Sequence, residues 1–387
     1  HLWHVVPGAH FQRMFGQDFN PHLYRLLDSC ADHIHWGGGH WTESRGGKGV
    51  HDRPGGGHAH AGAMVYLGDN WPDRYRNGLF TCNIHGNRVN HDTLDRRGSG
   101  YVARHAPDVI YANDPWFRGL VVAYGPDGGV YIADWTDTGE CHNYQVAHTT
   151  SGRIYKIVYG DLKARRFDLA KLSDAELVKL QSHKNDWHVR HARRLLQERA
   201  VAGRLDRDTA PALLKILREN TDATRQLRAL WTLHAIGALD EQLLLEMLKC
   251  PQEYVRAWAV QLALEDQKPS PSVLQRLAQM AGDDSAAFVR LYLAAGLQRL
   301  AAEKRWAIAE ALLAHGEDAT DAYLPLMNWY GIEPLVETDR ERFASLVEKA
   351  RIPLVRELIA RREAALDHGL APLVRLLGRV DSADVQA

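Results

Sequence analysis

The second half of the chain repeats one short pattern four times. An aliphatic residue followed by arginine opens an apolar segment at Val189-Arg190, Leu227-Arg228, Val255-Arg256 and Val289-Arg290. Successive arginines lie 38, 28 and 34 residues apart, and a second apolar segment with helical spacing falls between them. One helix pair cannot bury its apolar stripe alone, so a repeat of this length requires neighbouring pairs to stack. The pattern therefore predicts an α-solenoid, which we place over residues 170–387.

Before residue 161 the composition is different. This part holds 24 of the 32 glycines and 15 of the 21 histidines, whereas the remainder is rich in the good helix formers Leu, Ala, Arg and Glu. Short apolar runs bounded by Gly, Pro, Asn and Asp predict β-strands, and these runs are 63–66, 78–82, 119–123, 130–134 and 152–158. Short strands with a Gly-Pro-Asp-Gly turn between them are typical of a β-propeller blade. Residues 1–160 therefore predict the last two or three blades of a propeller.

Bulk properties exclude several classes of protein. The formal net charge is −1, which gives no attraction to nucleic acid or to an anionic membrane. No apolar run approaches the roughly 20 residues that cross a bilayer. The cysteines form no CxxCH motif, so no haem is expected in this chain. The chain starts at His1 without an initiator methionine, and a closed propeller needs about four to eight blades. We therefore expect a fragment of a longer protein.

Two Gly-rich segments, 33–41 and 55–62, concentrate histidines. On a strand, residues at positions i and i+2 share a face, which suits the pairs His33/His35 and His58/His60 to metal ligation or proton transfer. The candidate catalytic bases or polar lining residues are His35, His40, His58, His60 and the later His85. The alternative is a Gly-rich loop whose histidines are solvated or locally hydrogen-bonded.

Polar residues follow the apolar run at 78–82, at the position where a propeller strand would reach the central channel. Arg88 can hold an anionic ligand as a bidentate fork, and Asn87 lies beside it. Arg118 is a third candidate for cofactor binding. The alternative for Arg88 is an ion pair with Asp92 or Asp95 at a turn.

Three carboxylates, Asp134, Asp137 and Glu140, lie within seven residues. Calcium takes oxygen ligands, so these residues are candidates for a metal site. Their spacing matches no EF-hand loop. The alternative is that each carboxylate caps a turn in solvent.

Several long motifs together resemble one family. Residues 33–42 (HIHWGGGHWT), 55–90, 113–119 (NDPWFRG) and 125–142 are similar to the last propeller blades of the membrane-bound dehydrogenase family of planctomycete-type bacteria. Residues 324–334 (LPLMNWYGIEP) resemble the HEAT-repeat region of that family. Its propellers are similar to glucose/sorbosone dehydrogenases, which use pyrroloquinoline quinone. The resemblance implies a partial β-propeller followed by a HEAT-like α-solenoid over most of the chain.

An exported quinone-dependent oxidoreductase is the function that the resemblance implies. Such a protein oxidises a sugar, polyol or other alcohol with pyrroloquinoline quinone and calcium, and its HEAT array docks a protein partner. It would be periplasmic, and held at the membrane through parts outside this chain. The family's N-terminal propeller portion and its C-terminal c-type cytochrome are not in this sequence. The family's quinone-binding and base residues therefore cannot be transferred one by one.

Two other functions are consistent with the same residues. A non-catalytic propeller and HEAT scaffold would bind polysaccharide or protein, and exposed tryptophans would stack on sugar rings. The candidates for that stacking are Trp36, Trp41, Trp71, Trp116 and Trp135. Metal-dependent hydrolysis would instead use the histidine clusters.

Overall fold

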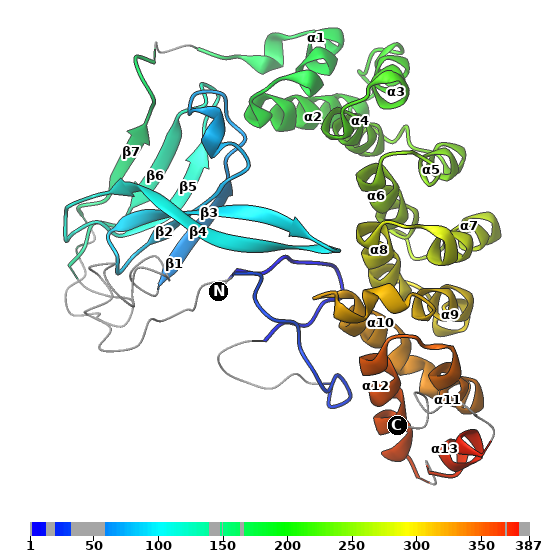
Figure 1. Cartoon of the computed structure of the whole chain (residues 1–387). Helices are drawn as coiled ribbons and strands as arrows, with labels where there is room; N and C mark the ends of the chain where they lie inside the picture. The colour runs from blue at the N-terminus through cyan, green and yellow to red at the C-terminus, as the bar shows by residue number, and fades with distance from the viewer. Residues whose placement is uncertain are drawn as a thin grey trace. The chain divides into compact units, whose positions relative to one another are not determined.

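The computed structural model describes residues 2–12, 20–31, 59–138, 148, 150–162, 166–367 and 370–378. Within these ranges, seven β-strands precede thirteen α-helices (Figure 1). The β-then-α order predicted from composition is therefore confirmed. No helix in the same ranges is long and apolar enough to cross a membrane.

The chain divides into two compact units. The first contains residues 1–2, 30–95 and 102–238, and the second contains residues 3–29, 96–101 and 239–387. The first unit therefore includes four α-helices as well as both sheets. The compact units do not follow the compositional break near residue 160, because the first helices pack with the sheets.

Both sheets belong to the first unit, apart from residues 96–101, which are the end of β3, the turn after it and the start of β4. One sheet has the strand order β1 (His60–Val65), β2 (Leu79–Asn83), β3 (Arg88–Arg97), β4 (Gly100–Tyr111). The other has the order β5 (Gly119–Tyr124), β6 (Val130–Asp134), β7 (Arg153–Ile157). Five of the seven strands overlap the predicted apolar runs. The pattern does not predict β3 and β4, because buried polar residues of β3 replace the expected apolar ones.

One apolar core lies between the two sheets. Cys82 of β2 pairs with Val89 of β3, and both point into this core together with Phe80. Val122 and Ile132 enter it from the second sheet. Successive residues of a strand point to opposite faces, so the other face of β2 and β3 is polar. That face carries buried Thr81, Asn83, Arg88, Asn90 and Asp92.

The Tyr66 hydroxyl joins the loop after β1 to the turn between β5 and β6. It donates to the carbonyl oxygen of Gly128 at 2.9 Å and accepts from the backbone N–H groups of Asn70 and Trp71 at 3.0 and 2.7 Å. Gly128 has φ +76°, and a Cβ there would lie 2.5 Å from the Asn70 nitrogen. The turn therefore requires glycine at this position.

Four α-helices complete the first unit: α1 (Asp174–Lys179), α2 (Asp186–Val201), α3 (Thr209–Glu219) and α4 (Ala223–Ala235). α1 packs on α3 and α2 packs on α4, so the helices form two layers.

The second unit, taken by itself, also has two alternating helix layers. In one layer α6 (Glu253–Ala263), α8 (Ala287–Leu297), α10 (Leu324–Ile332) and α12 (Pro353–Ala364) pack one on the next. The other layer is formed in the same way by α5 (Glu241–Met247), α7 (Pro271–Asp283), α9 (Trp306–Leu313), α11 (Arg340–Lys349) and α13 (Leu370–Leu377).

The repeated arginines form internal ion pairs. Arg256 Nε donates to Asp284 at 2.7 Å, and Arg290 Nε donates to Asp318 at 2.8 Å. Each acceptor lies 28 residues after its arginine, so the two pairs are related by the 34-residue step seen in the sequence. Each pair ties the start of one helix to the residues before the next helix of the same layer. The repeated arginines of the sequence therefore mark ion pairs between successive helix pairs.

In the second unit, His4 lies between two aromatic rings. The ring centroids of Tyr101 and Tyr323 are 5.2 and 5.3 Å from that of His4, and both are edge-on. Its Nδ1 atom is buried and has no hydrogen-bond partner among the described residues. Burial lowers the pKa of His4, the charge of Arg96 lowers it further, and Asp321 opposes them. The folded state therefore disfavours protonation of this ring.

We expect the second unit to lose stability on acidification because of His4. Its folded-state pKa is lowered, so the unfolded chain binds the proton more readily. The contribution of neutral His4 to the free energy of unfolding is complete above the ordinary histidine pKa of about 6.5. It declines as the pH falls towards the folded-state pKa. His4→Phe keeps an aromatic ring in place and should remove this part of the decline. Urea unfolding of both proteins across this pH range is the measurement, and identical pH profiles would contradict the assignment.

Candidate functional site

The residues predicted for catalysis and binding fall into two groups. His35, His40, His58 and Glu140 lie outside the described residues. The described ones lie on or beside the strands, and they are His60 on β1, His85 and Asn87 between β2 and β3, Arg88 on β3, Arg118 before β5, Asp134 on β6 and Asp137 after it. His85 is buried in the turn between β2 and β3. His85, like the others, takes part in internal contacts.

A strand cluster of His60, Asn83, Arg88, Asn90 and Asp108 occupies the polar face of the first sheet. The Asn90 amide donates to Asp108 at 2.7 Å, which leaves Asn90 Oδ1 as an acceptor. That oxygen accepts from the Asn83 amide at 2.8 Å and lies 3.0 Å from His60 Nε2. His60 Nε2 must therefore carry a proton, and it does not offer the lone pair that a general base needs.

Arg88 is held by a buried carboxylate. Its Nη1 donates to Asp108 at 3.0 Å, and the two side chains are 5% and 1% exposed. The guanidinium also lies 4.9 Å from the ring centroid of Tyr111. Of the two carboxylates suggested for Arg88, Asp95 pairs with Arg104 instead, and β4 brings a further carboxylate, Asp108, to Arg88.

A second group, the loop cluster, consists of Asn87, Arg118, Asp134 and Arg153, and it includes the other predicted cofactor residues. The Arg118 guanidinium donates to the carbonyl oxygens of Pro115, Phe117 and Thr138 at 2.8, 2.9 and 3.3 Å. The Asn87 amide donates to the same Phe117 oxygen at 2.8 Å. Both side chains therefore fix the backbone that leads into β5.

Asp134 is the carboxylate at the centre of the loop cluster. It accepts from the backbone N–H groups of Arg118 and Thr136 at 2.7 and 2.9 Å, and its Oδ2 lies 2.7 Å from Arg153 Nη2. Asp137 accepts from the backbone N–H of His148 at 3.3 Å. Asp134 therefore caps a turn, as the alternative reading suggested, but it does so buried rather than in solvent. In the part of the chain that the structure describes, no three His, Cys, Asp or Glu side chains are grouped to hold a metal ion.

These contacts do not fit the cofactors that the resemblance implies. A quinone with carboxylates would need the donors of Arg88 or Arg118, and those donors serve Asp108 and backbone carbonyls. Calcium would need the oxygens of Asp134, and Arg153 already neutralises them. The described side chains of Arg88, Arg118 and Asp134 are therefore engaged in internal contacts that support the fold.

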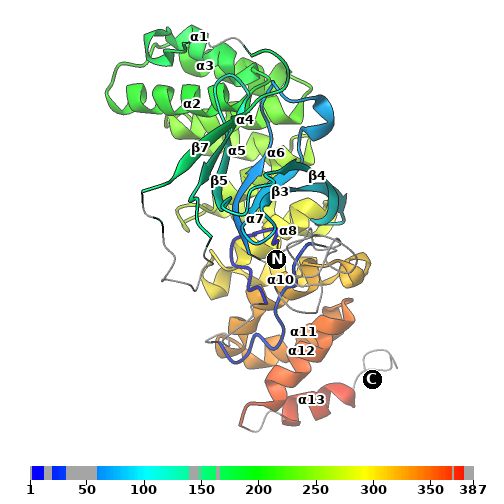
Figure 2. The ribbon, with the colours of Figure 1, turned by 90° about the vertical axis from the view of Figure 1, so that its left-hand side faces the viewer.

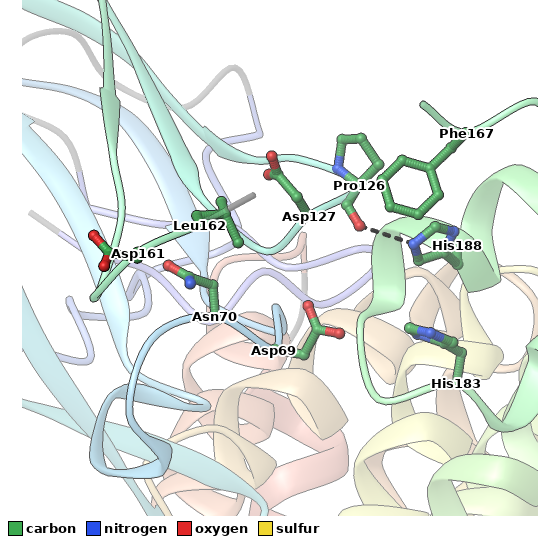
Figure 3. Close-up of a pocket in the computed structure, with 9 residues that line it drawn as sticks. All are labelled: Asp69, Asn70, Pro126, Asp127, Asp161, Leu162, Phe167, His183 and His188. Carbon is green, nitrogen blue, oxygen red and sulfur yellow. Dashed lines mark hydrogen bonds between the residues drawn. The ribbon is translucent and has the colours of Figure 1, made fainter. Parts of the chain in front are cut away.

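A surface pocket of about 360 Å³ lies in the first unit, and its lining includes no residue of either cluster (Figure 3). Its lining comes from the loop after β1, the turn between β5 and β6, the segment after β7 and the start of α2. The side chains that give it its chemistry are Asp69, Asp127, Phe167, His183 and His188. Asp127 is paired with Lys156, whereas Asp69 faces the hollow beside His183 in the close-up.

The walls of this pocket are joined by Asn185. Its side chain is fully buried, and its amide donates to Asp69 at 3.1 Å and to the carbonyl oxygens of Gly125 and Pro126 at 3.0 and 3.2 Å. Its oxygen accepts from the backbone N–H of Trp187 at 3.0 Å and so caps α2. One side chain therefore sets the position of the first turn of α2 against two strand-connecting loops.

The two pocket histidines have opposite hydrogen-bonding roles. His188 Nε2 lies 2.8 Å from the Pro126 carbonyl oxygen, which can only accept, so Nε2 carries the proton and Nδ1 is an acceptor. His183 Nδ1 accepts from the backbone N–H of Asn185 at 3.0 Å, which leaves Nε2 as the donor of that ring. Burial lowers the pKa of His188, which keeps that ring neutral at neutral pH. His188 therefore offers an acceptor, Nδ1, and His183 offers a donor, Nε2.

Sequence reasoning did not select His183 or His188, because it found no catalytic constellation in the helical half. The available signal was the segment His183-Lys184-Asn185-Asp186, in which a helix-capping asparagine lies two residues after a histidine. Only the fold brings that segment to the Gly-Pro-Asp-Gly turn.

Removing Asp108 should destabilise the first unit strongly. Asp108→Ala leaves the Arg88 charge buried without its partner, which costs about 3–5 kcal/mol. Asp95→Ala breaks an exposed pair with Arg104, and that loss is about 0–1 kcal/mol. Chemical denaturation of both variants measures the difference. Equal stabilities would mean that Arg88 is not held by Asp108 and is available to a ligand.

Comparison with known proteins adds one match. Residues 40–161 match a family model described as a domain of unknown function (DUF7133). The match spans the described strands and stops before the first α-helix. No curated protein matches the chain.

Proposed function

We propose that this chain is a binding protein whose pocket in the first unit takes a hydroxyl-rich ligand, a saccharide or another polyol. The observation that carries this proposal is the pair of imidazoles of His183 and His188 beside Asp69, one with a free donor and the other with a free acceptor. The predicted catalytic and cofactor residues that the structure describes contact one another or the backbone instead. This favours the binding alternative over catalysis.

The lining matches hydroxyl chemistry. A hydroxyl group donates one hydrogen bond and accepts others, so a polyol needs donors and acceptors side by side. The pocket supplies a donor from His183 Nε2, and acceptors from His188 Nδ1 and the Asp69 carboxylate. The Phe167 side chain is 36% exposed and lies edge-on to His188 at a centroid distance of 4.9 Å. It offers an apolar surface beside a few placed polar groups, which is the usual composition of a small-ligand site.

The architecture supports a finer proposal about the fold. We infer that the two face-packed sheets are blades of a β-propeller and that the helices form a HEAT-like solenoid. The antiparallel strands around a shared core support the first inference. The two helix layers and the recurring arginine–aspartate pairs support the second. A solenoid of this kind presents a broad surface for a protein partner.

A quinone-dependent sugar or alcohol dehydrogenase of the periplasm stays a prediction from the resemblance alone. Its quinone and calcium would have to be held by residues other than Arg88, Arg118 and Asp134. The same binding experiment therefore tests both functions.

Binding of saccharides should raise the melting temperature of the full chain. A panel of mono- and oligosaccharides is screened by thermal shift, and hits are measured by calorimetry. Asp69→Ala and His188→Ala should each weaken binding by about tenfold, which is ~1.4 kcal/mol. His191→Ala is the matched control, because His191 lies on the same helix and stacks on Trp187 outside the pocket.

Pyrroloquinoline quinone with calcium forms the second arm of the screen. The binding proposal expects saccharide binding that is lost in the pocket variants and no shift with the quinone. A shift with the quinone and calcium, combined with dye-linked oxidation of a sugar, would instead establish the dehydrogenase. If saccharide binding is unchanged in both Asp69→Ala and His188→Ala, the binding site lies outside this pocket.

A further inference from the structure

The pocket of the first unit has an acidic lining. Its described residues include three aspartates, Asp69, Asp127 and Asp161, and no lysine or arginine. The pocket lies where the start of α2 meets the end of the second sheet, and both ribbon views show α2 at that end (Figures 1 and 2). The charge that a ligand meets there therefore depends on which aspartates have cationic partners.

One of the three aspartates is neutralised. Asp127 pairs with Lys156, and its other oxygen accepts from the backbone N–H of Gly129 at 3.2 Å. Asp69 and Asp161 are exposed and form no ion pair within the described part of the chain. Two carboxylates of the pocket therefore carry charge that the described residues do not balance.

Asp69 has an oxygen available to a ligand. Its Oδ1 accepts from the Asn185 amide at 3.1 Å, which holds the side chain in the pocket wall. Its Oδ2 makes no hydrogen bond to the residues that the structure describes, and the carboxylate faces the hollow in Figure 3. A carboxylate has about four lone-pair sites, so Asp69 can accept further hydrogen bonds from one ligand group.

Acceptors outnumber donors among the pocket side chains that are open to a ligand. The acceptors are Asp69, Asp161 and His188 Nδ1, and the donor is His183 Nε2. Asn70 adds neither, because its nitrogen and oxygen both bond to the backbone after β7, at 3.2 and 2.8 Å. A hydroxyl group donates one hydrogen bond, whereas an ammonium group donates three and accepts none. An excess of acceptors therefore matches an ammonium group better than another hydroxyl.

The remaining side chains of the pocket tolerate a cation. Burial lowers the pKa of His188, so its ring is neutral at neutral pH and does not repel a positive charge. Phe167 beside it is 36% exposed, and the face of an aromatic ring attracts cations. Both groups are therefore compatible with a charged amine.

We propose that the pocket selects an amine-bearing polyol, an amino sugar, whose ammonium group binds Asp69 and whose hydroxyl groups bind His183 and His188. The inference rests on the proposed function, because it names the class of saccharide that the same pocket takes. Asp69 is then the residue that determines specificity. A sugar acid is disfavoured, since its carboxylate would meet the like charges of Asp69 and Asp161.

Calorimetry on the full chain compares glucose, glucosamine, N-acetylglucosamine and glucuronate, or the same derivatives of whichever panel sugar binds. The pH is one at which the sugar amine is protonated. At low salt, glucosamine should bind at least about threefold more tightly than glucose, because an exposed ion pair contributes modestly. N-Acetylglucosamine lacks the charge and should lose this advantage, and glucuronate should bind most weakly. Salt at about 0.5 M should reduce the advantage of glucosamine by screening.

The ratio of the glucose and glucosamine dissociation constants tests the role of Asp69. Asp69→Asn keeps an oxygen for the Asn185 amide and removes the charge. The ratio should then fall to about one, whatever the overall loss of affinity. Asp73→Asn is the matched control, because Asp73 belongs to the same loop and pairs with Lys184 outside the pocket lining. This variant should keep the wild-type ratio.

The outcomes separate this inference from the proposed function. An advantage of glucosamine that is lost on acetylation and in Asp69→Asn supports the amino-sugar inference. If neutral sugars bind and glucosamine has no advantage, or if Asp69→Asn keeps the advantage, the inference is wrong and the polyol proposal stands. If no saccharide of the panel binds, the polyol proposal itself is wrong, and the inference with it.

Discussion

The side-chain amide of Asn185 is the interaction on which the first unit's candidate site depends. Its two protons serve three acceptors, on Asp69, Gly125 and Pro126, and its oxygen caps α2. A buried amide that lost these partners would cost the full desolvation of its polar atoms. The helix start therefore has one favourable position against the strand-connecting loops. That position puts His183 and His188 beside Asp69 and fixes the tautomer of each ring.

Buried polar groups elsewhere in the first unit serve the fold. The strand cluster and the loop cluster satisfy Arg88, Asn90 and Asp134 with charged or backbone partners. Such networks are costly to bury unless each member is paired, and complete pairing makes one arrangement of the strands preferred. The same residue types line catalytic sites, so composition alone does not separate the two roles. For the described residues the geometry indicates the structural role, because Asp108 and backbone carbonyl oxygens accept from Arg88 and Arg118.

Much of the fold could be predicted from the sequence, and the reasons are local. Alternating apolar residues and a Gly-Pro-Asp-Gly turn predict β5 and β6, and the recurring arginines predict the stacked helices. β3 could not be found in this way, because its buried face carries Arg88, Asn90 and Asp92 instead of apolar residues. The partner of Arg88 depends on how β3 and β4 align, which no short-range signal encodes. The pocket depends on contacts over about 60 residues or more, such as His188 with Pro126, and no spacing rule reaches that far.

Backbone hydrogen exchange of the full chain, with and without pyrroloquinoline quinone and calcium, tests the central claim most directly. The claim is that the polar side chains of the strand cluster and the loop cluster are already bonded to one another or to the backbone. Amides in residues 83–92, 114–118 and 132–137 should then exchange slowly without any ligand, and the quinone and calcium should not slow them further. Fast exchange that becomes slow when both are added would contradict the account and place a cofactor site in these clusters.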